Sequence, residues 1–170
     1  MKANLDENAD KYLVREGMEE LNEELFTHAI QFDMIRRLYL GNSDCCSGGR
    51  AIGNSSNIST ENVIAKKIAG YKSQDIKKEI YDKEQLITFD EVVEKLVASK
   101  LKCCYCSCKI MLIYKNVREP TQWTLDRKDN DLCHSCDNTV IACLKCNLQR
   151  RVMNVDKFEF TKKLTIQKGF

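Results

Sequence analysis

Two C-x-x-C pairs constrain the fold of this chain more than any other feature of its sequence. Cys103 and Cys106 form the first pair, Cys143 and Cys146 form the second, and 36 residues lie between the pairs. Each pair turns two thiolates toward one point, and four such ligands complete the tetrahedral coordination that Zn²⁺ prefers. A site of this kind has no open position for a substrate, so it is structural. The sequence therefore predicts a zinc site that stabilises a module too small to bury a large core.

The other six of the ten cysteines are less regularly spaced. Cys45 and Cys46 are adjacent, and we interpret them as free thiols because neighbouring residues cannot easily bind one ion together. The last four leave two interpretations open, a second zinc site or uncoordinated thiols: Cys104, Cys108, Cys133 and Cys136.

Charge and hydropathy indicate an intracellular protein. The first ten residues are acidic and lack the apolar stretch of a secretory signal, and no run approaches the roughly 18 apolar residues of a membrane helix. We therefore expect the cytoplasm or nucleus, where thiols stay reduced, and no membrane partner. Residues 101–170 carry 13 Lys and Arg against 7 Asp and Glu, whereas the first 100 residues carry 14 against 18. The basic C-terminal part is compatible with a polyanionic partner.

The N-terminal region, residues 1–98, is predicted to be helical with one flexible loop. Apolar residues at three- and four-residue steps predict an amphipathic helix over about 9–40, with a break near Gly17 left open. Residues 41–60 are rich in Gly, Ser and Asn, which is typical of a long loop. A second helix is expected over about 60–69, followed by a polar stretch.

A third helix, over about 88–99, has the clearest local signals. Thr88 followed by Glu91 is a capping box, in which each side chain accepts a hydrogen bond from the backbone at the other residue. The apolar residues that follow fall on one helical face: Phe89, Val92, Val93, Leu96 and Val97.

Residues 99–170 are predicted to form a small ββα module with a C-terminal tail. Residues 122–125 and 139–142 are strand-like, and Asp137 and Asn138 between them favour a turn. The second C-x-x-C pair then leads into a helix. The predicted fold class is therefore α+β, with a helical N-terminal region and a zinc-stabilised ββα module.

This arrangement would bring two oxygen-bearing side chains together. A hairpin followed by a helix places Asp126, at the end of the first strand, beside Asn147, in the first turn of the helix. One carboxylate and one amide oxygen, with water in the other positions, suit Mg²⁺ or Mn²⁺. Such an ion could bind a scissile phosphate and stabilise charge on the leaving oxygen.

The order of these motifs resembles that of HNH endonucleases, the ββα-metal or His-Me finger class with a treble-clef zinc site. The motifs are C-x-Y-C, L-D-R-x-x-N, H-x-x-x-N and A-C-x-x-C-N-x-x-R, and they cover about residues 99–155. The chain looks especially like the variants of phages and large DNA viruses, in which D-R stands in place of D-H.

The resemblance implies a role for each matching residue. Asp126 and Asn147 would bind the catalytic metal, and Asn138 would brace the loop through backbone hydrogen bonds. The paired cysteines would hold the structural zinc. Three basic residues would contact backbone phosphates and give salt-dependent affinity for nucleic acid: Lys145, Arg150 and Arg151.

One position departs from the main family. Arg127 stands where the general-base histidine is expected, and an arginine stays protonated and cannot accept a proton. Arg127 could still bind the phosphate or stabilise its charge. His134 is the nearest candidate for the base. The alternatives for the base are Tyr105 or a metal-bound water without a protein base. His134 itself could instead be a structural residue of the hairpin loop or a zinc ligand.

Two functions from different classes follow. The first is a metal-dependent endonuclease that hydrolyses phosphodiester bonds in DNA, favoured by Asp126 with Asn147. The second is a non-catalytic zinc module that binds nucleic acid or builds an assembly such as a virion, kept open by Arg127. A third interpretation is a transcription-type zinc ribbon, but the L-D-R and C-N motifs argue against it. The N-terminal helices leave a homodimer, or a viral or host protein partner, open.

Overall fold

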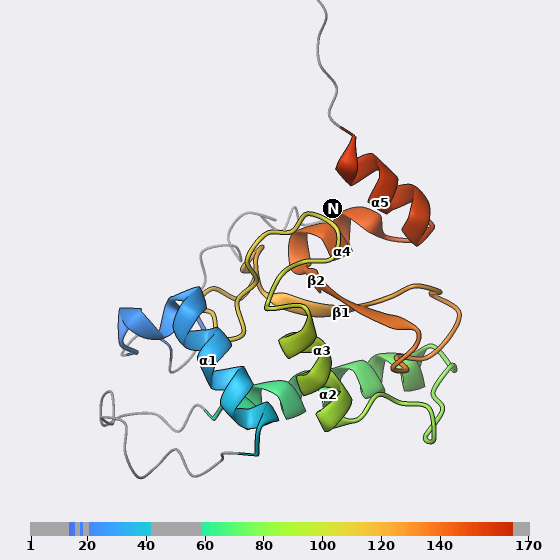
Figure 1. Cartoon of the computed structure of the whole chain (residues 1–170). Helices are drawn as coiled ribbons and strands as arrows, with labels where there is room; N and C mark the ends of the chain where they lie inside the picture. The colour runs from blue at the N-terminus through green and yellow to red at the C-terminus, as the bar shows by residue number, and fades with distance from the viewer. Residues whose placement is uncertain (1–13, 16–17, 19–20, 42–58, 165–170) are drawn as a thin grey trace, which may run out of the picture.

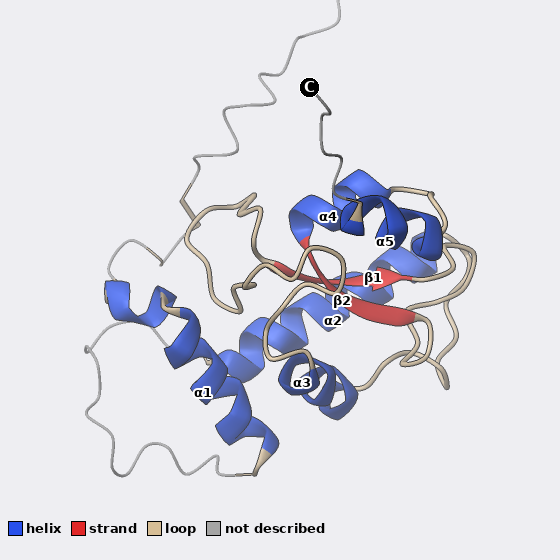
Figure 2. Ribbon diagram, turned by 45° about the horizontal axis from the view of Figure 1, so that its top comes forward, coloured by secondary structure: helices blue, strands red, loops and turns tan. Residues whose placement is uncertain are grey.

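The fold is a two-stranded sheet between two pairs of helices (Figures 1 and 2). A computed structural model describes residues 14–15, 18, 21–41 and 59–164. Helices α4 and α5 lie on one side of the sheet, and α2 and α3 lie on the other. The predicted α+β class is confirmed. The elements are a 3₁₀ helix (Glu23–Phe26), α1 (His28–Tyr39), α2 (Thr60–Lys77), α3 (Phe89–Ala98), β1 (Trp123–Arg127), β2 (Thr139–Cys143), α4 (Leu144–Arg150) and α5 (Val155–Lys163).

The antiparallel hairpin of β1 and β2 sets the geometry of everything that follows it. Trp123 pairs with Cys143 and Arg127 pairs with Thr139, so both predicted strands are confirmed. Every residue of β1 is buried, since the strand is covered on both faces. Helix α4 starts directly after Cys143 and contacts both strands. One turn of α4 separates Asn147, which contacts Thr124 of β1, from Arg150, which contacts Asp126.

Helix α3 forms as its local sequence predicts. The Thr88 hydroxyl accepts a hydrogen bond from the Glu91 N–H at 3.4 Å, and the Glu91 carboxylate accepts one from the Thr88 N–H at 2.7 Å. Val92, Val93 and Leu96 are buried on its inner face. The capping box and the apolar face are both confirmed.

The helix predicted over about 9–40 is interrupted at Thr27, and the break left open near Gly17 falls outside the described residues. The 3₁₀ helix precedes α1, and Thr27 between them is extended, with φ −81° and ψ 138°. The Asn22 side chain accepts a hydrogen bond from the backbone two residues on, which starts the 3₁₀ turn separately. Such a local bond competes with helix continuation, and apolar periodicity does not reveal it. Residues 9–13 lie outside the described part of the chain.

The helix predicted over 60–69 continues for two more turns as α2. Gly70 does not end it. Tyr71 and Asp75 are buried one turn apart on the inner face, and the Tyr71 hydroxyl accepts a hydrogen bond from the Leu125 N–H at 2.9 Å. Tertiary contacts therefore outweigh the weak helix propensity of glycine. Of the loop predicted over 41–60, residues 42–58 with both their cysteines lie outside the described residues.

One hydrophobic core crosses the predicted boundary between residues 98 and 99. It joins Ile64 of α2 and Val92 of α3 to Trp123 of β1 and Phe158 of α5, all buried. The helical region and the ββα module therefore share a core. None of the described helices is long and apolar enough to cross a membrane.

Candidate functional site

Four cysteines form a cluster that could hold a metal ion such as zinc. Their sulfur atoms all lie within 4.8 Å of one another, and each can offer one ligand. Cys103 and Cys106 come from the turn after α3, Cys143 from the end of β2 and Cys146 from the first turn of α4. Cys143 also caps α4, because its sulfur accepts a hydrogen bond from the Cys146 N–H at 3.4 Å. The predicted grouping of the two pairs is confirmed.

A second cluster is not assembled in the described residues. The remaining described cysteines form no group of three or more ligands with one another or with nearby His, Asp or Glu side chains: Cys104, Cys108, Cys133 and Cys136. Cys104 is exposed and Cys133 is buried in the loop between the strands. The uncoordinated-thiol interpretation therefore fits these four positions.

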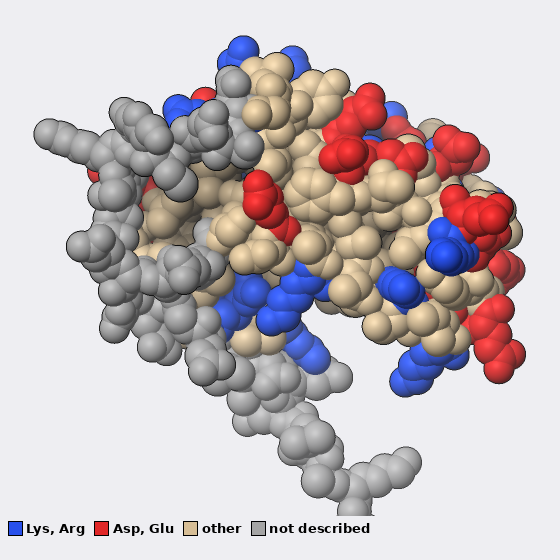
Figure 3. All heavy atoms as spheres, turned by 90° about the horizontal axis from the view of Figure 1, so that it is seen from below, with Lys and Arg blue, Asp and Glu red and all other residues tan. Residues whose placement is uncertain are grey.

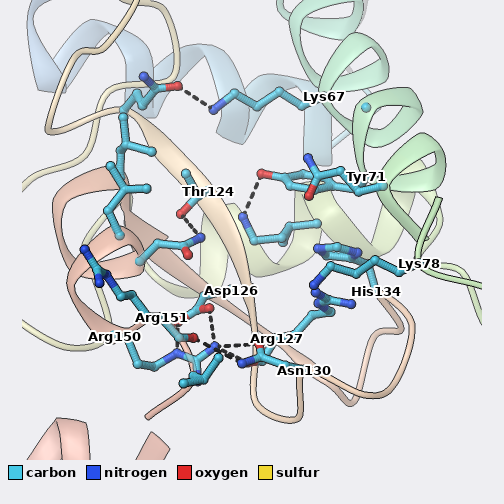
Figure 4. A pocket seen from close by; sticks show the side chains of 18 of the residues that line it. Lys67, Tyr71, Lys78, Thr124, Asp126, Arg127, Asn130, His134, Arg150 and Arg151 are labelled. Atoms are coloured by element: carbon cyan, nitrogen blue, oxygen red, sulfur yellow. Dashed lines mark hydrogen bonds and ion pairs between the residues drawn. The ribbon is translucent and has the colours of Figure 1, made fainter. Parts of the chain in front are cut away.

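A cleft of about 600 Å³ lies between α2 and the hairpin with α4. Figure 4 shows Lys67, Tyr71 and Lys78 entering it from α2, opposite Asp126, Arg150 and Arg151. Asp126 is the one acidic residue among the lining residues, whereas the basic ones are Lys66, Lys67, Lys78, Arg127, Arg150 and Arg151. On the face that Figure 3 shows, Lys and Arg side chains gather along the lower edge and Asp and Glu side chains toward the right. The cleft therefore suits an anionic ligand.

The Asp126 carboxylate is held by Arg150 in a buried, bidentate ion pair. Arg150 Nε and Nη2 lie 2.6 and 2.7 Å from the two carboxylate oxygens, and the Tyr105 hydroxyl donates a third hydrogen bond at 2.8 Å. Asp126 and Arg150 are 3% and 2% exposed. The hydrogen bond from Arg150 to Asp126 raises the pKa of the guanidinium. Asp126 therefore has one lone-pair position beyond these three contacts.

Arg150 does not fit its predicted role of surface phosphate contact. Besides Asp126 it donates to the Arg127 and Met153 carbonyls, at 2.6 and 2.7 Å, so its donors are used inside the protein. The periodicity of α4 explains this: residue 150 lies one turn beyond residue 147 and so meets the end of β1.

Asn147 lies one turn from the position expected for it. Its side-chain amide donates to the Thr124 hydroxyl at 3.1 Å, and among the described residues no hydrogen bond joins it to Asp126. Both residues still line the cleft. Asp126 and Asn147 therefore do not face each other directly. Each offers an oxygen to the same wall of the cleft, and Asn147 contacts β1 at Thr124, two residues before Asp126.

Asn138 holds the loop between the strands. Its side-chain amide donates to the Asp129 and Cys133 carbonyls, both at 2.9 Å, and its carbonyl accepts from the Asp129 N–H at 2.9 Å. These backbone bonds fix the loop that carries His134. The side chain is buried by this bracing, so its contribution to any reaction is positional.

His134 pairs with a residue that the sequence did not single out, Asp75 of α2. Asp75 Oδ1 lies 2.6 Å from His134 Nδ1, and Asp75 Oδ2 accepts from the His134 backbone N–H at 2.8 Å. The Tyr71 ring packs against the imidazole with 4.7 Å between centroids. Because a carboxylate can only accept, this contact favours the tautomer with hydrogen on Nδ1. Nε2 is then the ring nitrogen that can accept a proton.

The environment keeps His134 neutral at ordinary pH. Burial lowers its pKa, the hydrogen bond and charge of Asp75 raise it, and the nearby Arg127 lowers it, with a net lowering. His134 thus lines the cleft with a lowered pKa, and a buried carboxylate holds its imidazole.

Arg127 is buried in the same group and does not extend into solvent. Its guanidinium lies 3.5 Å from Asp75 Oδ1 and donates to the Leu132 carbonyl at 3.2 Å. Its expected role as a phosphate clamp would require it to leave these partners. Arg151 is exposed at the end of α4 and lines the cleft, whereas Lys145 is exposed and does not line it.

Lys67 is another lining residue that sequence reasoning missed. Its ammonium donates to the Gln122 side chain at 3.2 Å and to the Trp123 carbonyl, and lies 4.6 Å from the Trp123 ring centre. Burial lowers the pKa of Lys67 to about 7, and the charge of Arg15 adds to this effect. The residue anchors α2 to β1, and the only sequence signal was its place on the face of a helix that was predicted too short.

Comparisons with known proteins add one similarity. No protein-family profile and no solved structure matches the chain. An uncharacterized protein of Acanthamoeba polyphaga mimivirus is 38% identical over 96 residues, which are 56% of this chain and 16% of that protein. The chain thus spans about one sixth of the length of this viral relative.

Proposed function

We propose that the protein is a metal-dependent endonuclease of the HNH type that hydrolyses phosphodiester bonds in DNA. The observation that carries the proposal is the His134–Asp75 pair beside a cleft on which three basic side chains are exposed, Lys66, Lys78 and Arg151. Basic walls attract a polyanion, and a neutral imidazole activates water. The four-cysteine cluster and the strand–strand–helix order that follows it support a treble-clef zinc module as the scaffold.

In this proposal the protein's own groups carry the proton transfer. A DNA strand enters the cleft, and water attacks a phosphorus atom in line with the leaving oxygen. His134 Nε2 takes the proton from that water while Asp75 stabilises the resulting imidazolium through Nδ1. Arg151 and Lys78 neutralise the flanking phosphates, because both are exposed on the cleft.

The donor set fits a divalent ion that binds together with the substrate. Asp126 already carries Arg150, so it cannot by itself compensate a resident Mg²⁺ ion. Mg²⁺ usually binds through one or two carboxylates plus substrate phosphates, and Asp126, Asn147 and a phosphate would supply such a set. When bound, the ion supplies charge stabilisation on the leaving oxygen.

The alternative is a non-catalytic zinc protein that binds nucleic acid or serves in a viral assembly. The buried Asp126–Arg150 pair favours it, because a carboxylate neutralised by arginine is a stable structural element without a metal. The mimivirus relative is compatible with either function.

Nicking of supercoiled plasmid distinguishes the two functions. We expect cleavage that requires added Mg²⁺ or Mn²⁺, and we expect Asn147→Ala to reduce its rate by about 100-fold or more, since the leaving oxygen loses its stabilisation. Asn147→Ala is preferred over a change at Asp126, which would leave the buried charge of Arg150 without its carboxylate partner. Gln149→Ala, at an exposed position on the same helix, is the matched control. Wild-type protein that binds zinc but gives no metal-dependent nicking would leave the non-catalytic function.

A further inference from the structure

Helices α2 and α4 contribute different residues to the cleft. Apart from Tyr71, Asp75 and Lys78, the residues of α2 have no part in the proposed catalytic scheme. We propose that the exposed, cleft-lining side of α2 is a binding surface for the sugar-phosphate backbone of duplex DNA, with Lys66 and Lys78 at its two ends and the DNA backbone closest to the helix at Gly70. The proposal rests on the proposed function for the identity of the ligand.

The residues of this face share one side of the helix. Lys66, Gly70, Gln74 and Lys78 follow one another at four-residue steps, so they form one stripe along α2. All four are exposed and all four line the cleft. The stripe itself contains no acidic residue; of the two acids adjacent to it in sequence, Asp75 is buried against His134, and Glu79 is exposed beside Lys78. Its charge and hydrogen-bonding groups therefore match phosphate.

Gly70 is the observation that points to a close ligand. It lies in the interior of an 18-residue helix, where glycine is less favourable than alanine. A Cβ atom at this position would meet nothing within 4 Å, so packing within the described residues gives no reason for a glycine. A ligand backbone that runs over the helix at this point would give one, because a side chain would occupy its path.

The length of the stripe fits several phosphates. Lys66 and Lys78 are separated by about 18 Å along the helix axis at the usual rise per residue. Phosphates of one strand of duplex DNA follow one another about every 3.4 Å along its axis, so a stripe of this length can contact more than one phosphate. Lys66 and Lys78 would then bind the backbone on either side of Gly70.

The first test blocks the proposed path without changing charge. Binding of a fluorescein-labelled 30-base-pair DNA duplex is measured by anisotropy without added Mg²⁺, so that cleavage does not interfere. We expect Gly70→Gln to weaken binding by about tenfold or more, while Ala65→Gln, an exposed position of α2 outside the cleft, leaves it unchanged. Gly70→Ala should raise the melting temperature by about 2 °C, since the free protein has room for the methyl group.

The second test removes the charges. Lys66→Ala and Lys78→Ala should each lower the slope of log Kd against log salt concentration by about one, whereas Lys72→Ala, on the opposite side of α2, should not. The proposal would be overturned if Gly70→Gln and Ala65→Gln bound DNA equally well and if the salt slopes of Lys66→Ala and Lys78→Ala equalled that of the wild type. A wild-type protein that binds the duplex but never cleaves it would remove the nuclease function and leave this surface intact.

Discussion

Replacing Cys146 with serine should release the metal and destabilise the whole described fold, because the helical region and the ββα module share one core. The four sulfurs close one cluster, and three of these cysteines lie in the shared hydrophobic core. Apparent zinc-binding free energies of about 10–16 kcal/mol are comparable to the whole stability of a domain, about 5–15 kcal/mol. Zinc content and the thermal unfolding curve of the purified protein measure the effect.

Cys136→Ser is the matched control for this experiment. Cys136 is half-buried and lies outside the cluster, so its replacement should keep the zinc stoichiometry and lower the stability by about 1 kcal/mol or less. A Cys146→Ser protein that retains one zinc ion per chain and its melting temperature would contradict the assignment of the cluster as structural.

Replacing His134 with alanine should reduce DNA cleavage by about 10²- to 10⁴-fold, the usual contribution of a general base. The protein should still bind DNA, because the phosphate contacts belong to other residues. Plasmid nicking and duplex binding are measured on the same preparation. Cleavage at the wild-type rate would dismiss His134 as the base and leave a metal-bound water or Tyr105. Burial and Asp126 raise the pKa of Tyr105, which makes it a poor base.

The pH profile separates the chemical role of His134 from a structural one. The base works only when neutral, so the rate should rise with pH through the pKa of His134 and then level off. Because the net effect of its surroundings lowers that pKa, the acidic limb should lie below about pH 6.5, the ordinary value for histidine. In His134→Ala the residual activity should lack this limb. If the same acidic limb remains in His134→Ala, it reports the titration of another group and contradicts the assignment of His134 as the base.

Asp75→Asn provides an independent check on the same pair. The hydrogen bond and the charge of Asp75 both raise the pKa of His134, so their loss should move the acidic limb to still lower pH and reduce the maximal rate. The variant also leaves Arg127 without its buried partner, which costs about 3–5 kcal/mol of stability. Rates are therefore compared at a temperature where both proteins are folded. A limb that moves to higher pH would contradict the assigned geometry.

Local patterns determined a large part of this fold. The two C-x-x-C pairs predicted the metal cluster, because each pair needs only one turn of chain to aim its sulfurs. The capping box at Thr88 and Glu91 predicted the start of α3, and two strand-like stretches with the turn residues Asp137 and Asn138 between them predicted β1 and β2. Each of these features depends on hydrogen bonds or periodicity within a few residues, so the sequence alone contains them.

The site depended on contacts that no local pattern records. Asp126 was expected to face Asn147, but it meets Arg150, because the register of α4 against β1 is set by packing of the whole helix. Asp75 stayed hidden because α2 was expected to end before it, and its partner His134 lies 59 residues further along the chain.

The sequence by itself thus determined the four-cysteine cluster and the strand–strand–helix order, together with the candidate residues on them. Tertiary structure decided which carboxylate holds the histidine, which arginines are held in buried ion pairs, and that α2 forms the second wall of the cleft. The physical reason is that buried ion pairs and helix docking join segments far apart in the chain. Their energies depend on desolvation and close packing, which exist only once the core has formed.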